Sequence, residues 1–337
     1  MKLKALLVIL LTALAACSGG QRQAPAGGRT VIRFATDWRA EAEHGGFYEA
    51  LATGEYKRRG LDVRIIQGGP GVNVPQLIAT HAVEMGMGSN SFIVMNLVRE
   101  KIPAMAVAAF FQKDPSVLIA HPGVGNDSLA ALKGKPIMIS ADTRVGYWLF
   151  LKAKFGYSDS QIRPYNFNPA PFLADKSAVQ QGYLTSEPYL IEKQGVQPVV
   201  MLIADSGYTS YGSLIETSQK LVEQKPDLVQ RFVNASIEGW YSYLYGDPSP
   251  ANALIKRDNP EESDDLIAYA IAKMKQYGVV DSGDSQNQGI GTMSDPRWKD
   301  FFDVMARQGL YPKDMDWHKA YTLRFVNQRV GIALKPK

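Results

Sequence analysis

The chain has 337 residues, of which 45% are hydrophobic and 21% charged, and it carries a formal net charge of +4 at pH 7. A charge this small gives no support to nucleic acid as a partner. The chain is longer than one hydrophobic core usually fills, so we expect two lobes.

An export signal is predicted in residues 1–16. Two lysines precede an apolar run from Ala5 to Ala13, which is too short to span a bilayer as a finished helix, and small residues follow it. The segment Leu14-Ala15-Ala16-Cys17 resembles a lipobox. This resemblance implies cleavage before Cys17 and a lipid on its sulfur. The alternative is an ordinary secretory signal in which Cys17 is incidental.

A flexible tether is predicted in residues 17–28. This segment is rich in Gly, Ala, Gln and Pro and has no apolar period, so it cannot bury enough surface to offset its ordering entropy. Cys17 is the only cysteine, so the chain cannot form an internal disulfide. An exported protein of this kind relies on core packing alone.

Alternating strands and helices are predicted from Arg29 onward, which is typical of α/β units with largely parallel sheets. The predicted strands are 30–36, 62–67, 84–87, 104–110, 136–140, 163–168 and 198–203. The predicted helices between them are 47–59, 74–80, 91–101, 129–133 and 147–155. The pattern after Leu221 is helical, at 227–245, 251–256, 261–276, 296–308 and 317–325. This order indicates a chain that builds one lobe, crosses to a second and returns to complete the first.

The sequence contains no catalytic or metal-binding motif. Its four histidines are far apart and show no metal-ligand spacing, and a second cysteine is absent. The glycine-rich segment 68–71 follows a strand but lacks the Lys-Ser/Thr pair of a phosphate loop, and no G-x-S-x-G elbow is present. We therefore predict a protein that binds a ligand, with no catalytic residue, no metal and no cofactor.

Trp38 and His44 are the first candidate ligand-binding residues, because they follow the first predicted strand and precede a helix. Ligands of open α/β sheets bind beyond the carboxyl ends of strands, where helix N-termini offer free N–H groups. Trp38 can stack on a flat ligand and His44 can form a hydrogen bond to it. The alternative is that Trp38 packs in the core and His44 caps the helix.

Two further strand ends carry polar candidates. Ser89 and Asn90 follow the strand at 84–87, and Asp142, Thr143 and Tyr147 occupy the corresponding turn of the second lobe. In each case a helix-capping role explains the polar residues as well as a ligand role does.

Glu187 stands directly before a proline, where the backbone is driven to extended geometry. Without further information we expect Glu187 to lie on the protein surface, because most glutamates do.

The predicted mature chain resembles, over nearly its full length, the periplasmic solute-binding proteins of bacterial ABC importers. The resemblance is to the family that includes binders of thiamine pyrimidine precursors and the yeast pyrimidine synthase. The matching segments are Asp37-Trp38, 44–48, 54–63, 76–78, 84–88, 182–187 and 290–298.

This resemblance implies a type II two-lobe α/β fold, in which each lobe is a mostly parallel sheet flanked by helices and a ligand cleft lies between the lobes. We expect the first lobe to comprise 29–120 and 214–337 and the second 121–213. The expected partners are a small-molecule ligand, an ABC permease with its ATPase, and a membrane reached through the lipid on Cys17. We expect a monomer on the periplasmic side of a bacterial membrane, with the inner membrane favoured.

The resemblance also implies a role for Glu187, because relatives that bind the aminopyrimidine of thiamine use an acidic residue in the matching segment. Its carboxylate can accept from an exocyclic amino group and pair with the adjacent ring nitrogen. The usual Pro-Asn after the tryptophan is Arg39-Ala40 here, so riboflavin and alkanesulfonates such as taurine stay open as ligands. An enzyme like the pyrimidine synthase is the alternative of another class, disfavoured by the export signal and by the absence of a cysteine-rich motif.

Overall fold

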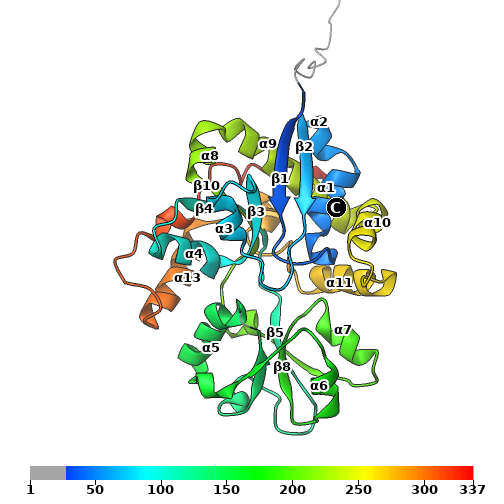
Figure 1. The fold of residues 1–337 in the computed structure, drawn as a ribbon, viewed down its shortest axis with the longest axis vertical. Helices are drawn as coiled ribbons and strands as arrows, with labels where there is room; N and C mark the ends of the chain where they lie inside the picture. The colour runs from blue at the N-terminus through cyan, green and yellow to red at the C-terminus, as the bar shows by residue number, and fades with distance from the viewer. Residues whose placement is uncertain (1–27, 141, 337) are drawn as a thin grey trace, which may run out of the picture.

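Two α/β lobes make up the computed structural model, the larger above the smaller in Figure 1. The structure describes residues 28–140 and 142–336. The predicted export signal, Cys17 and all of the predicted tether except residue 28 lie outside the described residues. Each lobe contains a five-stranded sheet flanked by helices, which confirms the predicted fold class.

The sheet of the larger lobe has the strand order β2-β1-β3-β10-β4. Its strands are β1 (Thr30–Ala35), β2 (Leu61–Ile66), β3 (Met85–Asn90), β4 (Ala104–Phe111) and β10 (Gly212–Ser218). The helices of this lobe are α1 (Gly45–Ala52), α2 (Glu55–Arg58), α3 (Val74–Ala79), α4 (Ser91–Arg99), α8 (Gln219–Gln224), α9 (Pro226–Tyr245), α10 (Ser249–Asp258), α11 (Asp264–Gln276), α12 (Ser285–Gln288) and α13 (Asp295–Arg307).

The sheet of the smaller lobe has the strand order β7-β6-β8-β5-β9. Its strands are β5 (Ser116–Ala120), β6 (Ile137–Ile139), β7 (Ile162–Pro164), β8 (Val179–Tyr183) and β9 (Val199–Leu202), and its α-helices are α5 (Tyr147–Phe155), α6 (Ala170–Ala174) and α7 (Glu187–Glu192). The chain also contains the 3-10 helices η1 (Ala42–His44), η2 (Ala130–Leu132), η3 (Asp142–Val145), η4 (Asp159–Gln161), η5 (Ile203–Ser206), η6 (Trp317–Ala320) and η7 (Ile332–Leu334).

Each sheet has one strand that runs against its neighbours, and that strand enters from the other lobe. β10 is antiparallel to β3 and β4, and β5 is antiparallel to β8 and β9. The neighbouring strands end at the cleft, whereas an entering strand begins there and must run away from it. The chain passes between the sheets at 112–115 and 203–211. The structure therefore corrects the predicted boundary at 120, since β5 is paired within the second sheet rather than the first.

Local sequence signals explain most of the other differences from the predicted elements. The helix expected at 47–59 is divided into α1 and α2 at Gly54, whose φ of 83° lies in the left-handed region. The helix expected at 317–325 is limited to the short η6. Strand β8, with the sequence VQQGY, was not predicted because its two glutamines interrupt the apolar pattern, yet Gln180 is buried.

Close packing of α1 against α9 sets the position of the first strand-to-helix connection. A Cβ on Gly46 would lie 2.1 Å from the ring of Trp240, and one on Gly239 would lie 2.2 Å from the carbonyl oxygen of Gly46. Only glycine allows the two helices to approach this closely. Trp240 is buried among Phe47, Phe110 and Phe111. The N-terminus of α1 is thereby held at the cleft edge of the sheet.

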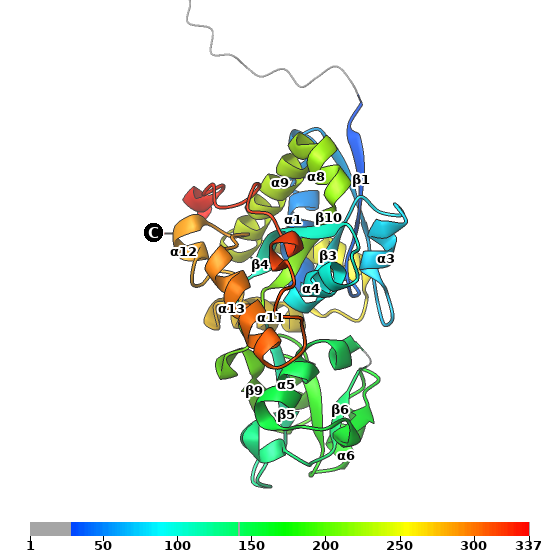
Figure 2. The same ribbon diagram turned by 90° about the vertical axis from the view of Figure 1, so that its left-hand side faces the viewer.

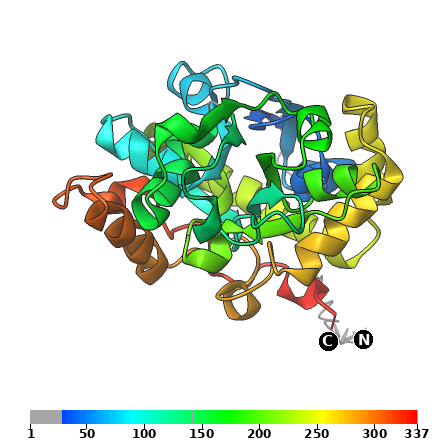
Figure 3. The same cartoon turned by 90° about the horizontal axis from the view of Figure 1, so that it is seen from below.

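The described chain begins at the end of the larger lobe that is remote from the smaller lobe, as both side views show (Figures 1 and 2). Viewed from below, α13 (orange) and the α10–α11 segment (yellow) flank the smaller lobe on opposite sides (Figure 3). Among the described residues, no helix combines the length and the apolar character needed to cross a membrane.

Candidate functional site

A cleft of about 450 Å³ lies between the two lobes. The larger lobe contributes the connection that follows β1, the end of β3, and residues 71–75, which lead into α3. The smaller lobe contributes the turn between β6 and α5, the turn between β8 and α7, and Phe167. The cleft is therefore lined by strand-to-helix turns of both sheets, which is where α/β folds bind ligands.

Six of the predicted site residues line this one cleft, although they come from four separate turns. They are Trp38, Ser89, Asn90, Thr143, Tyr147 and Glu187. Asp142 belongs to η3, but its side chain is outside what the structure describes. Whether these residues contact a ligand stays a prediction.

Asp37 organises the wall of the larger lobe. One carboxylate oxygen, Oδ2, accepts a hydrogen bond from the Ser89 hydroxyl at 2.5 Å, and Oδ1 lies 3.3 Å from His44 Nε2. His44 is fully buried and does not line the cleft. The prediction that His44 contacts the ligand is corrected on this geometry, because Asp37 lies at the cleft surface and the imidazole contacts it from the protein interior.

Helix capping accounts for Asn90 but not for Ser89. The Asn90 side chain accepts a hydrogen bond from the Phe92 N–H at 3.1 Å and so caps α4. The Ser89 hydroxyl is directed to Asp37 instead. Of these two neighbours, Ser89 is thus tied to the polar wall and Asn90 chiefly to the helix.

Glu187 is the first residue of α7, and its carboxylate is held in the cleft by two donors. Its Oε2 accepts the Tyr183 N–H at 2.7 Å and its Oε1 accepts the Tyr165 hydroxyl at 3.3 Å. The carboxylate also packs over Gly182, where a Cβ would lie 3.3 Å from Oε2. Burial raises the pKa of Glu187, and the hydrogen bonds offset part of that effect. Glu187 is thus a fixed acceptor in the cleft.

The turn that precedes α5 supplies two further polar groups. The Thr143 and Ser140 hydroxyls are 3.1 Å apart, and the Ser140 N–H donates to the Gln181 side chain at 2.6 Å. The Tyr147 hydroxyl is buried and has no hydrogen-bond partner among the described residues. A buried hydroxyl without a partner is costly, so Tyr147 is available to a ligand in the cleft.

Trp38 meets the smaller lobe directly. Its ring lies 4.5 Å from the ring of Phe167, centroid to centroid, with the planes tilted by 48°. Phe167 follows β7 and has a φ of 56°, an uncommon conformation for a residue other than glycine. The sequence analysis did not identify Phe167, because no local pattern marks an aromatic residue that closes a cleft.

Three acidic residues of the larger lobe were also missed as site residues. Asp37, Glu41 and Glu43 all line the cleft and lie between the end of β1 and the start of α1. Glu43 accepts a hydrogen bond from the Thr185 hydroxyl of the smaller lobe, which is a second contact between the lobes. Burial raises the pKa of Glu43, and burial together with the neighbouring carboxylates raises that of Glu41. The signal available in the sequence was this run of acids at a strand end.

Positively charged side chains are absent from the described residues that line the cleft. Arg144, in the turn before α5, is exposed and is not among the lining residues. The cleft therefore combines aromatic rings and carboxylates, a set that suits hydrogen-bond donors and cations rather than anions.

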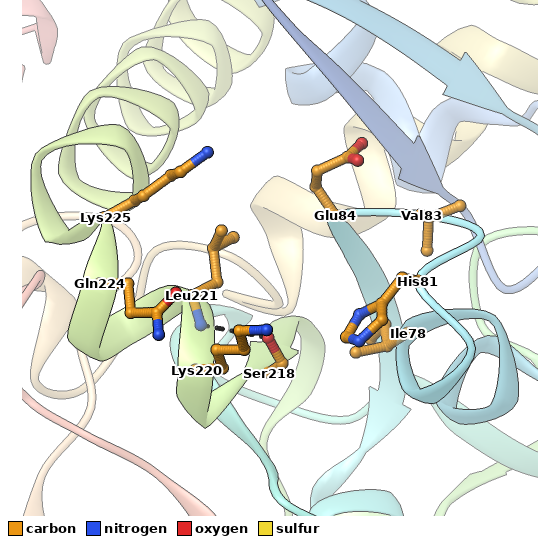
Figure 4. A pocket seen from close by; sticks show the side chains of 9 residues that line it. All are labelled: Ile78, His81, Val83, Glu84, Ser218, Lys220, Leu221, Gln224 and Lys225. Atoms are coloured by element: carbon orange, nitrogen blue, oxygen red, sulfur yellow. Dashed lines mark hydrogen bonds between the residues drawn. The ribbon is translucent and has the colours of Figure 1, made fainter.

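A second hollow, of about 340 Å³, lies at the opposite end of the larger lobe's sheet (Figure 4). It is lined in part by His81 and Glu84, at the start of β3, and by Lys220 and Lys225 of the α8 region. The Glu84 carboxylate is already paired with Arg33 at 2.6 Å. This hollow lacks the aromatic surface of the cleft and lies at the wrong ends of the strands for a ligand site of an α/β sheet.

Comparisons with known proteins identify the family and the fold of this chain. The family described as NMT1/THI5 like matches residues 41–251. The riboflavin-binding protein RibY of Chloroflexus aurantiacus is 25% identical over 348 residues, which cover 97% of this chain and 98% of RibY.

Solved structures that share the fold include an alkanesulfonate-binding protein and a desulfurization enzyme. The alkanesulfonate-binding protein SsuA from Xanthomonas axonopodis pv. citri, bound to MOPS, has a TM-score of 0.64 at 13% identity, over 88% of this chain and 99% of SsuA. The desulfurization enzyme DSZB has a TM-score of 0.58 at 12% identity, over 90% of this chain and 100% of DSZB. At these identities the likeness shows the periplasmic-binding-protein fold alone.

Proposed function

Since this chain belongs to the NMT1/THI5-like family, we propose that it is the substrate-binding component of an ABC importer for a small flat heteroaromatic nutrient. Its ligand is a pyrimidine precursor of thiamine. The observation that carries this proposal is the placement of Glu187 and Trp38, one from each lobe, in a single cleft.

Glu187 and Trp38 supply the two interactions that an aminopyrimidine needs. The Glu187 carboxylate accepts from the exocyclic amino group and pairs with the adjacent ring nitrogen, and Trp38 offers an aromatic face. A ligand without donors leaves the buried carboxylate unpaired, which costs about 1–3 kcal/mol or more. Micromolar affinity needs about −8 kcal/mol, which aromatic contacts and a few buried hydrogen bonds supply.

Transport follows from a shift between open and closed forms. A ligand that contacts both lobes gains its full interaction energy only when the lobes come together. In this structure the Trp38–Phe167 and Glu43–Thr185 contacts join the two lobes, as a closed form requires. The permease then distinguishes the loaded protein by its closed shape.

Riboflavin is the second candidate ligand, because the relative that matches this chain over almost its full length binds riboflavin by name. An alkanesulfonate is disfavoured, since a sulfonate requires cationic or N–H donors and the described lining contains no Lys, Arg or His. We propose no enzymatic activity.

The first test is native mass spectrometry of the exported form, residues 17–337 with Cys17→Ser, purified without denaturation. A bound mass equal to that of an aminopyrimidine supports the proposed ligand. A bound mass equal to that of a flavin would show that the ligand is a flavin instead. Isothermal titration with 4-amino-5-hydroxymethyl-2-methylpyrimidine follows. We expect Glu187→Gln to weaken its binding at least about tenfold while Glu192→Gln, on the same helix, leaves it unchanged. Equal affinities would remove Glu187 from the site.

We also propose that the mature protein is a monomer anchored on the periplasmic side of the inner membrane by a lipid on Cys17. Cys17→Ser should then release the protein from the membrane fraction, and an intact mass of the wild type should include the acyl chains. A wild-type protein recovered in the soluble fraction without added mass would contradict the anchor.

A further inference from the structure

The described lining of the cleft contains several carboxyl groups and no positively charged side chain. The larger lobe brings Asp37, Glu41 and Glu43 to the lining and the smaller lobe brings Glu187. The described residues that line the cleft include no Lys, Arg or His to compensate them. When the lobes meet, four carboxyl groups share one cavity of about 450 Å³.

The charged groups behind the lining do not supply the missing compensation. Glu262, in the loop between α10 and α11, adds a further carboxyl next to Glu43, and Asp114 lies near Tyr183 at the crossing into the smaller lobe. His44 is one imidazole behind four carboxyl groups: its Nε2 lies 3.3 Å from Asp37 and 3.9 Å from Glu41, and it offsets part of the effect of burial on the pKa of Glu43. Arg297 interacts with Asp114 but does not line the cleft, and Arg39 is exposed and paired with Glu261 at 3.0 Å.

Glu216 adds another carboxyl directly beneath the cleft. It is fully buried on β10, neither of its oxygens has a hydrogen-bond partner among the described residues, and it lies over Gly88 of the cleft lining. Burial raises its pKa to about 8, which favours the uncharged form at neutral pH. The floor of the cleft thus offers no positive charge either.

Aromatic groups and a free hydroxyl complete the lining. Trp38, Tyr147, Phe167 and Tyr183 all reach the cleft, and π faces attract cations as well as flat rings. The Tyr147 hydroxyl is a buried polar group of the lining without a partner, and it marks a position where a ligand makes a hydrogen bond. Carboxylates together with aromatic faces are a recurrent recognition set for organic cations.

We propose that the cleft selects a flat heteroaromatic cation, whose positive charge is what allows Glu187 to close onto Asp37, Glu41 and Glu43. This inference rests on the proposed function and adds to it the charge of the ligand, which an aminopyrimidine acquires when the ring nitrogen that pairs with Glu187 is protonated. Without a counter-charge, closure brings like charges together in a medium of low dielectric constant and favours the open form. A cationic ligand removes that repulsion, so the lobes close only when the bound ligand carries a positive charge.

The raised pKa values of the cleft carboxyls agree with this account. Burial in the closed arrangement raises the pKa of Glu43 and of Glu187 above the ordinary value. Protons can therefore replace the cation at acid pH, and the ligand-free protein should close as the pH falls. At neutral pH the same carboxyls are ionised in the open form and hold the lobes apart.

The first experiment measures closure of the ligand-free protein by small-angle X-ray scattering between pH 5 and pH 8. We expect the radius of gyration of the wild type to decrease toward pH 5, and Glu187→Gln to be compact already at pH 7.5. Glu192→Gln is the matched control and should follow the wild type. Circular dichroism establishes that each variant is folded. A radius of gyration that is independent of pH and of the Glu187 charge would overturn the inference.

The second experiment compares thiamine, a fixed cation, with 3-deazathiamine, its uncharged isostere, by isothermal titration at pH 7.5. We expect the wild type to prefer thiamine at least about tenfold, and Glu187→Gln to reduce that preference to about threefold or less. Equal affinity of the wild type for both compounds would overturn the inference and leave the proposed function intact. Charge-dependent closure with no binding of either compound or of the aminopyrimidine would support the inference and reject the proposed ligand.

Discussion

The imidazole Nε2 of His44 lies 3.3 Å from the Oδ1 of Asp37, and this contact anchors the polar wall of the cleft from inside the larger lobe. His44 is fully buried at the junction of η1 and α1, whereas Asp37 reaches the cleft surface. The two residues are seven positions apart on one connection, so the turn after β1 folds back to bring them together.

Removal of the hydrogen bond from Ser89 to Asp37 should weaken ligand binding without unfolding the protein. Ser89→Ala deletes the hydrogen bond to Oδ2, and a hydrogen bond to a charged group contributes about 1.5–3 kcal/mol. Because His44 still contacts the Oδ1 of Asp37, we expect ligand affinity to fall by only about threefold to tenfold. Isothermal titration measures this loss, and Tm should stay within about 2 °C of wild type. Unchanged affinity would show that His44 alone positions Asp37.

The aromatic contact between the lobes should contribute to closure rather than to folding. Phe167→Ala removes the ring that lies against Trp38, and such aromatic pairs contribute about 0.5–1.5 kcal/mol beyond their buried area. We expect faster ligand dissociation, measured by stopped-flow tryptophan fluorescence, with little change in Tm.

Leu190→Ala is the matched control for Phe167→Ala, because both side chains are 38% exposed and belong to the smaller lobe. The control should dissociate at the wild-type rate. If both variants lose ligand equally fast, the effect is a general weakening of the smaller lobe rather than loss of the contact with Trp38.

The close approach of Gly88 and Glu216 should make this glycine irreplaceable. A Cβ at position 88 would lie 1.9 Å from a Glu216 carboxyl oxygen that is buried and cannot move into solvent. We expect Gly88→Ala to lower the free energy of unfolding by about 1–3 kcal/mol, measured by urea denaturation. The added cost of Gly88→Ala should shrink in a Glu216→Ala background, where the clash is relieved. A fully additive double mutant would contradict this coupling.

The titration of Glu216 should make the protein less stable at alkaline pH. Burial raises its pKa to about 8, compared with an ordinary value of 4.5. Between these two values the unfolded chain has released a proton that the folded protein retains, so stability decreases as the pH rises through this range and is fully retained below it. Each pKa unit corresponds to about 1.4 kcal/mol.

The Glu216→Gln variant cannot ionise at this position, so its stability should not decrease in this way as the pH rises. We expect its Tm to exceed that of the wild type by several degrees at pH 9 and to match it within about 2 °C at pH 5, as measured by differential scanning calorimetry. The same Tm difference at both pH values would show that Glu216 does not titrate between them.

The sequence predicted those site residues whose position depends only on the neighbouring strand and helix. Trp38 and Thr143 each follow a strand and precede a helix, Ser89 lies at the end of a strand, and that order alone places them at the carboxyl edge of a parallel sheet. Glu187 was identified only through a family resemblance, since an acid before a proline is most often a surface residue. His44 follows the same local pattern but faces inward, because the turn after β1 directs it beneath Asp37.

Contacts between distant parts of the chain were beyond the reach of local patterns. Glu43 and Thr185 are separated by 142 positions, and Trp38 meets Phe167 across the cleft. Strand β8 has too polar a pattern to be recognised, and it is stable as a strand because β5 and β6 pair with it on either side. Each of these features depends on where a partner lies in space.

The sequence by itself determined the α/β class, the positions of most strands and helices, and the absence of recognisable catalytic and metal-binding motifs. These properties follow from hydrophobic period, helix-ending glycines and residue spacing, which act over a few neighbouring residues. Only the tertiary structure decided that Asp37, Glu41, Glu43 and Glu187 share one cleft without a compensating cation among the described lining residues. That outcome depends on how two lobes come together, and the electrostatic energy of carboxyl groups is set by their distances and burial in space rather than by their order along the chain.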